Sequence, residues 1–169
     1  MKNKIYLIGP MGSGKSTIGK LLSNKLKLPH YDLDKIIEID QGMPISTIFQ
    51  KYDEEYFRVL ESIALEKYSK LNSFVISTGG GAILKEKNQK LLNNGYVVYL
   101  KISLNAQYER IKNRTHRPLL DKKDVKSELE ILDNTRGRIY KNVSSIEVDV
   151  SNLDKEDVLS SIVNKLKIN

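Results

Sequence analysis

Short apolar runs and longer amphipathic segments alternate along the whole chain. Each apolar run has the length of a strand, and each amphipathic segment repeats its apolar residues at helical spacing. The predicted strands are residues 4–8, 30–32, 73–78, 96–101 and 146–150. The predicted helices are residues 16–27, 33–40, 46–50, 54–70, 85–93, 104–113, 125–140 and 154–167.

This alternation predicts an α/β fold in which a parallel sheet is covered by helices on both faces. No internal repeat, low-complexity tract or Pro/Gly-rich linker divides the sequence, so we expect residues 1–169 to form a single domain. In a three-layer sandwich of this kind, ligands bind beyond the carboxyl ends of the strands. The residues that directly follow each predicted strand are therefore the first candidates for a binding site.

Composition narrows the range of functions and locations. The sequence has no cysteine, which excludes disulfides and thiolate metal sites, and no apolar stretch is long enough for a signal peptide or a membrane span. The net charge of +7 suits anionic ligands. However, the lysines are dispersed among acidic residues, and no basic block with interleaved aromatic residues indicates nucleic-acid binding. We expect a cytoplasmic monomer that binds neither nucleic acid nor membranes.

The most specific motif lies between the first predicted strand and the first predicted helix. Gly9, Gly14, Lys15 and Ser16 fit the pattern G-x-x-x-x-G-K-[ST] of a phosphate-binding P-loop, and both flanks are those that the motif requires. The glycines allow positive φ, so consecutive backbone N–H groups can surround a polyphosphate at the start of the helix. Lys15 would reach the β- and γ-phosphates, and Ser16 would ligate Mg²⁺. The alternative, a flexible turn with a chance Lys-Ser pair, does not explain the two flanks.

Two aspartates follow the second predicted strand. If that strand continues through Asp34, its period of two places the carboxylates of Asp32 and Asp34 on one side, next to the P-loop. One carboxylate could then hold Mg²⁺ or its waters, while the other contacts a substrate hydroxyl. The alternative is that Asp34 only caps the helix that follows. The nearby P-loop favours the functional interpretation.

Three glycines, Gly79, Gly80 and Gly81, follow the third predicted strand. Their lack of side chains would let the backbone approach a ligand closely, although a plain flexible turn is the alternative. Arg58 and Arg136 become candidates for a binding role once an anionic substrate is considered. The residues alone do not separate these two arginines from ordinary surface charges.

A strongly basic segment, residues 110–124, lies between two predicted helices and contains Arg110, Arg117 and Pro118. The proline discourages helix before it, and the repulsion among like charges should be relieved when the segment folds over a triphosphate. His116 lies in this segment and His30 in the second predicted strand. Neither histidine has an evident partner for metal or nucleophilic chemistry, so we interpret them as a solvated residue and a strand filler.

Taken together, these motifs closely resemble the shikimate kinase family. They follow the family's order and spacing from residue 4 to about residue 150, and six motifs in register are specific although each alone is modest. The matching motifs are the P-loop, Asp32-x-Asp34, Phe57-Arg58, Gly79-Gly80-Gly81, Arg117-Pro118-Leu119-Leu120 and Arg136-x-x-x-Tyr140. The resemblance implies a P-loop kinase fold with a five-stranded parallel sheet, a substrate-binding section at about residues 33–61 and a mobile lid at about residues 112–124.

The resemblance also implies an activity and a set of site residues. The family transfers the γ-phosphoryl group of ATP, with Mg²⁺, to the 3-hydroxyl of shikimate on the route to chorismate and the aromatic amino acids. By resemblance, the shikimate contacts are Asp34, Arg58, Gly79, Gly80, Gly81 and Arg136. The implied nucleotide contacts are Gly12, Ser13, Gly14, Lys15, Ser16, Thr17, Arg110 and Arg117. The implied Mg²⁺ ligands are Ser16 and Asp32, and the implied catalytic residues are Lys15, Asp34 and Arg117.

Two other functions are compatible with a P-loop. The nearer is a kinase for another small metabolite, such as gluconate or a nucleoside monophosphate, and the glycine run and the Arg58/Arg136 pair argue against it. The more distant is a nucleotide-dependent switch of the GTPase type. That class reads guanine with Asn-Lys-x-Asp, and the Asn-Lys pairs of this sequence lack the aspartate; they are Asn3-Lys4, Asn24-Lys25 and Asn164-Lys165.

Overall fold

The computed structural model describes residues 3–112 and 124–167, and at its centre is a five-stranded sheet. The strand order is β2-β3-β1-β4-β5, and every pair of neighbours is parallel. The strands are β1 (Lys4–Ile8), β2 (His30–Asp32), β3 (Phe74–Ser77), β4 (Tyr96–Lys101) and β5 (Ile146–Asp149). The α/β fold class and all the predicted strands are confirmed.

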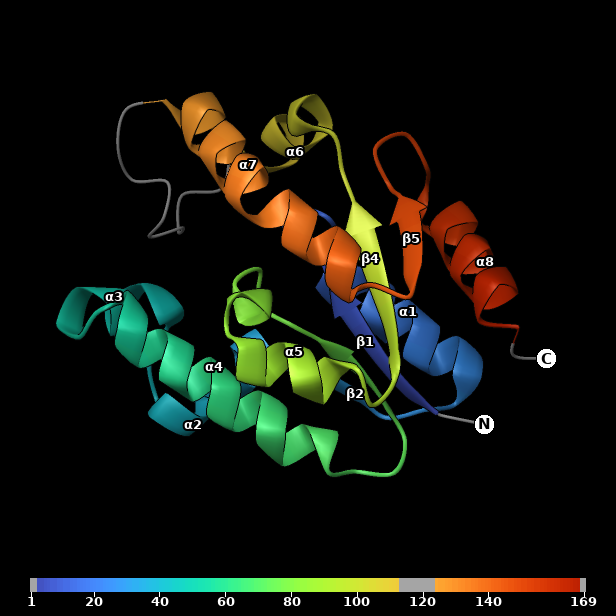
Figure 1. The fold of residues 1–169 in the computed structure, drawn as a ribbon, viewed down its shortest axis with the longest axis horizontal. Helices are drawn as coiled ribbons and strands as arrows, with labels where there is room; N and C mark the ends of the chain where they lie inside the picture. The colour runs from blue at the N-terminus through green and yellow to red at the C-terminus, as the bar shows by residue number, and fades with distance from the viewer. Residues whose placement is uncertain (1–2, 113–123, 168–169) are drawn as a thin grey trace.

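Helices connect the strands and cover the sheet on both sides (Figure 1). They are α1 (Lys15–Leu26), α2 (Leu33–Gln41), α3 (Ile45–Lys51), α4 (Glu54–Ser69), α5 (Glu86–Leu92), α6 (Leu104–Ile111), α7 (Val125–Val143) and α8 (Lys155–Leu166). Each was predicted, with ends that differ by a few residues at most. A short 3₁₀ helix, η1 (Ala82–Leu84), was not predicted. Among the described residues, no helix combines the length and apolar character that a membrane crossing needs.

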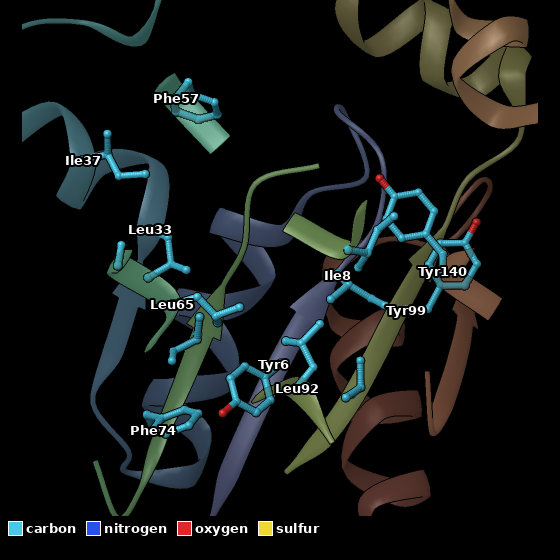
Figure 2. Packing of buried hydrophobic residues seen from close by; sticks show 14 of the residues in the cluster. Tyr6, Ile8, Leu33, Ile37, Phe57, Leu65, Phe74, Leu92, Tyr99 and Tyr140 are labelled. Atoms are coloured by element: carbon cyan, nitrogen blue, oxygen red, sulfur yellow. The ribbon is translucent and has the colours of Figure 1, made fainter. Parts of the chain in front are cut away.

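The two faces of the sheet carry separate cores. Tyr6 and Ile8 of β1 belong to a cluster with apolar residues of α2, α3, α4, α5 and α7, part of which Figure 2 shows. Ile5 and Leu7, which alternate with them, belong to a second cluster with residues of α1 and α8. Because successive side chains of a strand point to opposite faces, a strand buried on both faces is apolar throughout. This explains the uninterrupted apolar run of β1.

The second strand ends earlier than the aspartate prediction required. β2 stops at Asp32, whose carboxylate accepts a hydrogen bond from the backbone N–H of Lys35 at 3.4 Å and caps α2. Asp34 lies in the first turn of α2. The expectation that strand alternation aligns Asp32 with Asp34 was therefore wrong. The alternative, in which Asp34 caps the helix, does not hold either, because the cap is Asp32. The physical reason is that a helix start needs an acceptor for its free N–H groups, and Asp32 supplies it.

Candidate functional site

A pocket of about 700 Å³ gathers most of the predicted site residues. Its walls come from the segments that follow β1 and β3, and from α1, α2, α3, α4, α6 and α7. The predicted site residues that line it are Gly12, Gly14, Lys15, Ser16, Thr17, Asp34, Arg58, Gly79, Gly80, Gly81 and Arg136. The expectation that a ligand site would form beyond the carboxyl ends of the strands agrees with this position.

The P-loop has the backbone geometry that its glycines predict. The φ angles of Gly9, Gly12 and Gly14 are 143°, 78° and 91°, in the region that favours glycine. Gly14 is the N-cap of α1, and no side chain caps this helix. The Lys15 ammonium donates hydrogen bonds to the backbone carbonyls of Gly9 at 2.8 Å and Pro10 at 2.9 Å. The loop thus holds its lysine at the mouth of a helix N-terminus, which is a suitable place for phosphate.

Asp34 faces the pocket from the first turn of α2. Its Oδ1 atom is buried and accepts no hydrogen bond from the residues that the structure describes. Burial raises the pKa of Asp34, while the positive charge of Lys15 acts in the opposite direction. A buried carboxylate oxygen that accepts no hydrogen bond destabilises the fold unless a ligand donates a hydrogen bond to it. Asp34 can therefore accept a hydrogen bond from a hydroxyl group in the pocket.

Arg58 is held between two carboxylates of its own helix. Its guanidinium donates from Nη1 to Glu61 at 2.8 Å, and from Nη2 and Nε to Glu54 at 2.8 and 3.2 Å. Arg58 is 8% exposed and Glu61 is fully buried. These bonds use three of the five N–H donors of a guanidinium. The remaining donors leave Arg58 able to bind a carboxylate in the pocket.

Glu61 is a second carboxyl group of the site whose pKa is raised. Burial raises its pKa to about 7, against the lowering effect of the Arg58 charge. Its Oε1 atom has no hydrogen-bond partner among the described residues, and it lies against Gly79. A Cβ atom at Gly79 would overlap this oxygen and would lie 2.9 Å from Asp34 Oδ1. The glycine therefore lets two carboxyl groups approach the loop.

Gly81 has a similar role toward Arg58, because a Cβ atom there would overlap the guanidinium group. Gly80 differs: its Cβ would meet only ordinary contacts, the nearest 3.6 Å away at the Tyr140 hydroxyl. The run of glycines is thus not merely a flexible turn. At Gly79 and Gly81, the fold requires the absence of a side chain so that charged groups can pack against the backbone.

The predicted Mg²⁺ ligands lie together at a second hollow, which shares Ser16 with the main pocket. Ser16 and Asp32 both line this hollow of about 290 Å³, which also includes Lys20, His30 and Lys35. In residues 3–112 and 124–167, no group of three or more His, Cys, Asp or Glu side chains could hold a metal ion by itself. A hydroxyl and a single carboxylate fit an ion that takes its other ligands from phosphates and water, as Mg²⁺ commonly does.

Comparison with known proteins decides the family. The family model described as shikimate kinase matches residues 11–167. The chain belongs to the shikimate kinase family. A shikimate kinase of Legionella pneumophila (strain Corby) is 40% identical over 163 residues, which cover 96% of this chain and 93% of that relative. Another shikimate kinase, from Sulfurihydrogenibium sp. (strain YO3AOP1), is 40% identical over 168 residues, which cover 99% of this chain and 99% of that relative.

A solved structure of the family agrees with this assignment. The shikimate kinase from Acinetobacter baumannii in complex with shikimate matches with a TM-score of 0.94 and 32% identity, covering 98% of this chain and 93% of that chain. The family expectation drawn from the motifs is thereby confirmed. The family assignment argues against both alternatives from the sequence. The first was a kinase for another small metabolite, such as gluconate or a nucleoside monophosphate, and the second was a GTPase-type switch.

Two predicted nucleotide contacts among the described residues, Ser13 and Arg110, do not line the pocket wall. Ser13 is buried within the P-loop. Arg110 donates to the carbonyls of Val150 at 2.6 Å and of Gly12 at 3.4 Å, so it braces the outer side of the P-loop. Arg117 and residues 113–123 of the expected lid lie outside the described residues. The lid and the roles of these residues therefore stay predictions.

Sequence reasoning missed several residues that support the site. Glu54 and Glu61 lie four residues before and three residues after Arg58, and this helical spacing is a signal that could have revealed both partners. Gln107 donates to the carbonyl of Met11 at 3.0 Å, and the hydroxyl of Tyr140 donates to the carbonyl of Gly80. No local pattern indicates these last contacts, because α6 and α7 are far from the loops in sequence.

His30 has a polar neighbour that the sequence did not suggest. Its Nε2 atom lies 2.9 Å from the hydroxyl of Ser77, which donates to the backbone carbonyl of Lys15 at 3.0 Å. Gly19 makes room for this contact, since a Cβ there would overlap Ser77 and lie close to the imidazole. His30 is therefore more than a strand filler, because it links β2 and β3 to the start of α1.

Proposed function

We propose that this protein transfers the γ-phosphoryl group of ATP to the 3-hydroxyl of shikimate, giving shikimate 3-phosphate and ADP, on the route to chorismate and the aromatic amino acids. The observation that carries the proposal is the composition of a single pocket. A P-loop lysine, a buried carboxylate that lacks a donor, and two arginines line it together. These groups match a polyphosphate donor and an acceptor that has both hydroxyl groups and a carboxylate.

The acceptor end of the pocket suits the chemistry of shikimate. The two N–H groups that Arg58 retains, with the guanidinium of Arg136, would bind the planar carboxylate. Asp34 Oδ1 would accept from a ring hydroxyl, which would satisfy an oxygen that is otherwise buried without a partner. Because the pKa of Asp34 is raised, this carboxylate is also a better proton acceptor than an exposed one.

The phosphate end would act by charge and position. Lys15 would move from the carbonyls of Gly9 and Pro10 to the β- and γ-phosphates, and the N–H groups at the start of α1 would bind phosphate oxygens. When bound with ATP, Mg²⁺ would neutralise phosphate charge, held by Ser16 and Asp32. Phosphoryl transfer has a loose transition state, so alignment of the two reactants matters more than strong base catalysis.

We also propose that the protein is active as a monomer in the cytoplasm, since the described residues of a single chain already gather the groups that the reaction needs. Sedimentation of the active enzyme at assay concentration tests the oligomeric part of this proposal: a single species of 19.3 kDa is expected.

An acceptor panel tests the proposed function. The protein is incubated with ATP and Mg²⁺ and with shikimate, quinate, gluconate or AMP, and ADP release is followed. We expect release that depends on shikimate and stays near background with the other acceptors. Faster turnover of gluconate or AMP than of shikimate would instead support one of the alternative kinases.

A further inference from the structure

The glycine loop presents its backbone groups in an unequal way. The carbonyl of Gly79 accepts from the N–H of Ala82 at 3.3 Å, and that of Gly81 accepts from the N–H of Leu84 at 3.0 Å. The carbonyl of Gly80 accepts from the Tyr140 hydroxyl. Within the part of the chain that the structure describes, the N–H groups of these three glycines donate no hydrogen bond. All three glycines line the pocket. Their carbonyls already accept hydrogen bonds, so the loop can offer the pocket its backbone N–H groups.

The middle carbonyl is held differently from its neighbours. The bonds to Gly79 and Gly81 are short-range turn contacts that belong to the start of η1, whereas the bond to Gly80 comes from a side chain 60 residues away in sequence. A peptide group between two glycines rotates at little steric cost. Because the peptide is trans, the Gly80 carbonyl and the Gly81 N–H point in opposite directions. The Tyr140 contact therefore sets the direction of both groups.

Tyr140 is itself well fixed. It is 2% exposed, and its ring stacks on that of Tyr99 with the centroids 5.1 Å apart and the planes at 17° (Figure 2). Burial raises the pKa of Tyr140, while the charge of nearby Arg136 lowers it. The net shift is upward, so the hydroxyl keeps the proton that it donates to Gly80. The hydroxyl thus contacts the glycine loop at a pocket that Arg136 also lines.

We propose that Tyr140 is a positioning residue for the shikimate acceptor: it fixes the Gly80–Gly81 peptide so that the N–H of Gly81 faces the oxygens of the acceptor in the pocket that Arg136 also lines. The proposal rests on the proposed function, since it assigns a role at the same acceptor site. Tyr140 does not take part in the chemical step. Without the Tyr140 hydroxyl, the Gly80 carbonyl loses its hydrogen-bond donor and can turn toward the pocket. The carbonyl oxygen would then lie beside the oxygens of shikimate, and neither group could donate a hydrogen bond to the other.

The test compares two matched variants. Tyr140→Phe removes the hydroxyl and keeps the stacked ring, and Tyr99→Phe makes the same chemical change on the other ring of the pair. We expect Tyr140→Phe to raise the KM for shikimate about tenfold, with kcat lowered by no more than about threefold and the KM for ATP unchanged. Tyr99→Phe should leave all three constants near those of the wild type. Thermal unfolding of both variants is followed in parallel, because a role limited to stability would lower Tm without this selective change in KM.

Two failures are distinguishable. If the wild type shows no ADP release that depends on shikimate, the proposed function is wrong. If the wild type is active and the kinetic constants of Tyr140→Phe equal those of Tyr99→Phe, the positioning role alone is wrong. A crystal structure of the wild type with shikimate gives a result even if Tyr140→Phe does not fold. We expect the Gly80 carbonyl on Tyr140 and a loop N–H within hydrogen-bonding distance of a shikimate oxygen; a carbonyl turned to the ligand would overturn the proposal.

Discussion

The proposed phosphate end and the proposed acceptor end of the pocket are built in opposite ways. The phosphate end is a contiguous stretch, residues 9–17, that uses backbone N–H groups, a helix start and Lys15. The acceptor end takes its side chains from α2, α4 and α7 and adds the glycine loop, so its members are scattered between Asp34 and Tyr140. The first is therefore a local structure, and the second is a product of the tertiary fold.

This difference has consequences for mutation. Lys15 bonds to carbonyls of its own loop, and its removal disturbs no apolar cluster. Glu61 is fully buried and paired with Arg58, and Phe57 and Tyr140 belong to one of the two cores. Changes at the phosphate end should thus affect turnover and spare the fold. Changes at the acceptor end should affect stability and shikimate binding together.

The largest effect is expected from Lys15→Ala. The substitution removes the cation that would neutralise the transferring phosphate, so kcat should fall by about 10²-fold or more. The free energy of unfolding, from urea titration, should change little. Near-normal turnover in this variant would contradict the interpretation of the phosphate end.

The next effect concerns the buried carboxyl group of Glu61. Its pKa is about 7 in the folded protein and 4.5 in the reference state, so the folded protein binds the proton more tightly. Its contribution to stability is present in full below about pH 4.5 and is lost as the pH rises through 7. Relative to Glu61→Gln, the wild type should lose up to about 3 kcal/mol of unfolding free energy across this range.

Urea unfolding between pH 4.5 and 8 measures that change, with Glu66→Gln as the matched control on α4. Hydrogen bonding to Lys87 lowers the pKa of Glu66, a partly exposed residue, so Glu66 is charged well above pH 4.5. The difference between wild type and Glu66→Gln should therefore be flat above about pH 6, where Glu61 titrates, and should fall only slightly toward pH 4.5. A flat difference for Glu61→Gln as well would show that Glu61 has no unusual affinity for its proton.

A smaller effect is expected from Arg58→Lys and Arg136→Lys. Each change keeps the charge but loses the planar arrangement of N–H donors, so shikimate binding should weaken by roughly 1–3 kcal/mol while ATP binding is spared. Calorimetric titration with each ligand separates the two effects. Lys87→Ala serves as the control, because this exposed lysine pairs with Glu66 across the surface, away from the pocket lining. Equal behaviour of all three variants would return the arginines to ordinary surface charges.

The smallest effect distinguishes two glycines of one loop. Gly79→Ala should lower the free energy of unfolding by about 1–3 kcal/mol, because the new methyl group would overlap Glu61. Gly80→Ala meets only ordinary contacts and should leave stability unchanged or raise it by a few tenths of a kcal/mol. Thermal unfolding of both variants is the measurement. A larger loss for Gly80→Ala would contradict the packing at this loop.

The same contrast explains what the sequence could predict. The P-loop was predictable because its residues are contiguous and its flanks are a strand and a helix. The strand order β2-β3-β1-β4-β5 was not predictable from the hydrophobic pattern, since periodicity does not say which strands pair. Asp34 was placed on a continuing strand although it lies in the first turn of α2, because a three-residue strand gives little periodicity from which to judge where it ends. Glu61 was not predicted, although its position three residues after Arg58 on one helix is the spacing of an ion pair.

The position of phosphorylation tests the central claim most directly, namely that the acceptor end orients shikimate toward the P-loop. Shikimate is incubated with ATP, Mg²⁺ and the protein, and the product is examined by phosphorus–proton correlation NMR. We predict a single product whose phosphorus couples to the proton at carbon 3 of the ring. Phosphate on a different hydroxyl, or ATP hydrolysis with shikimate left unchanged, would contradict the account.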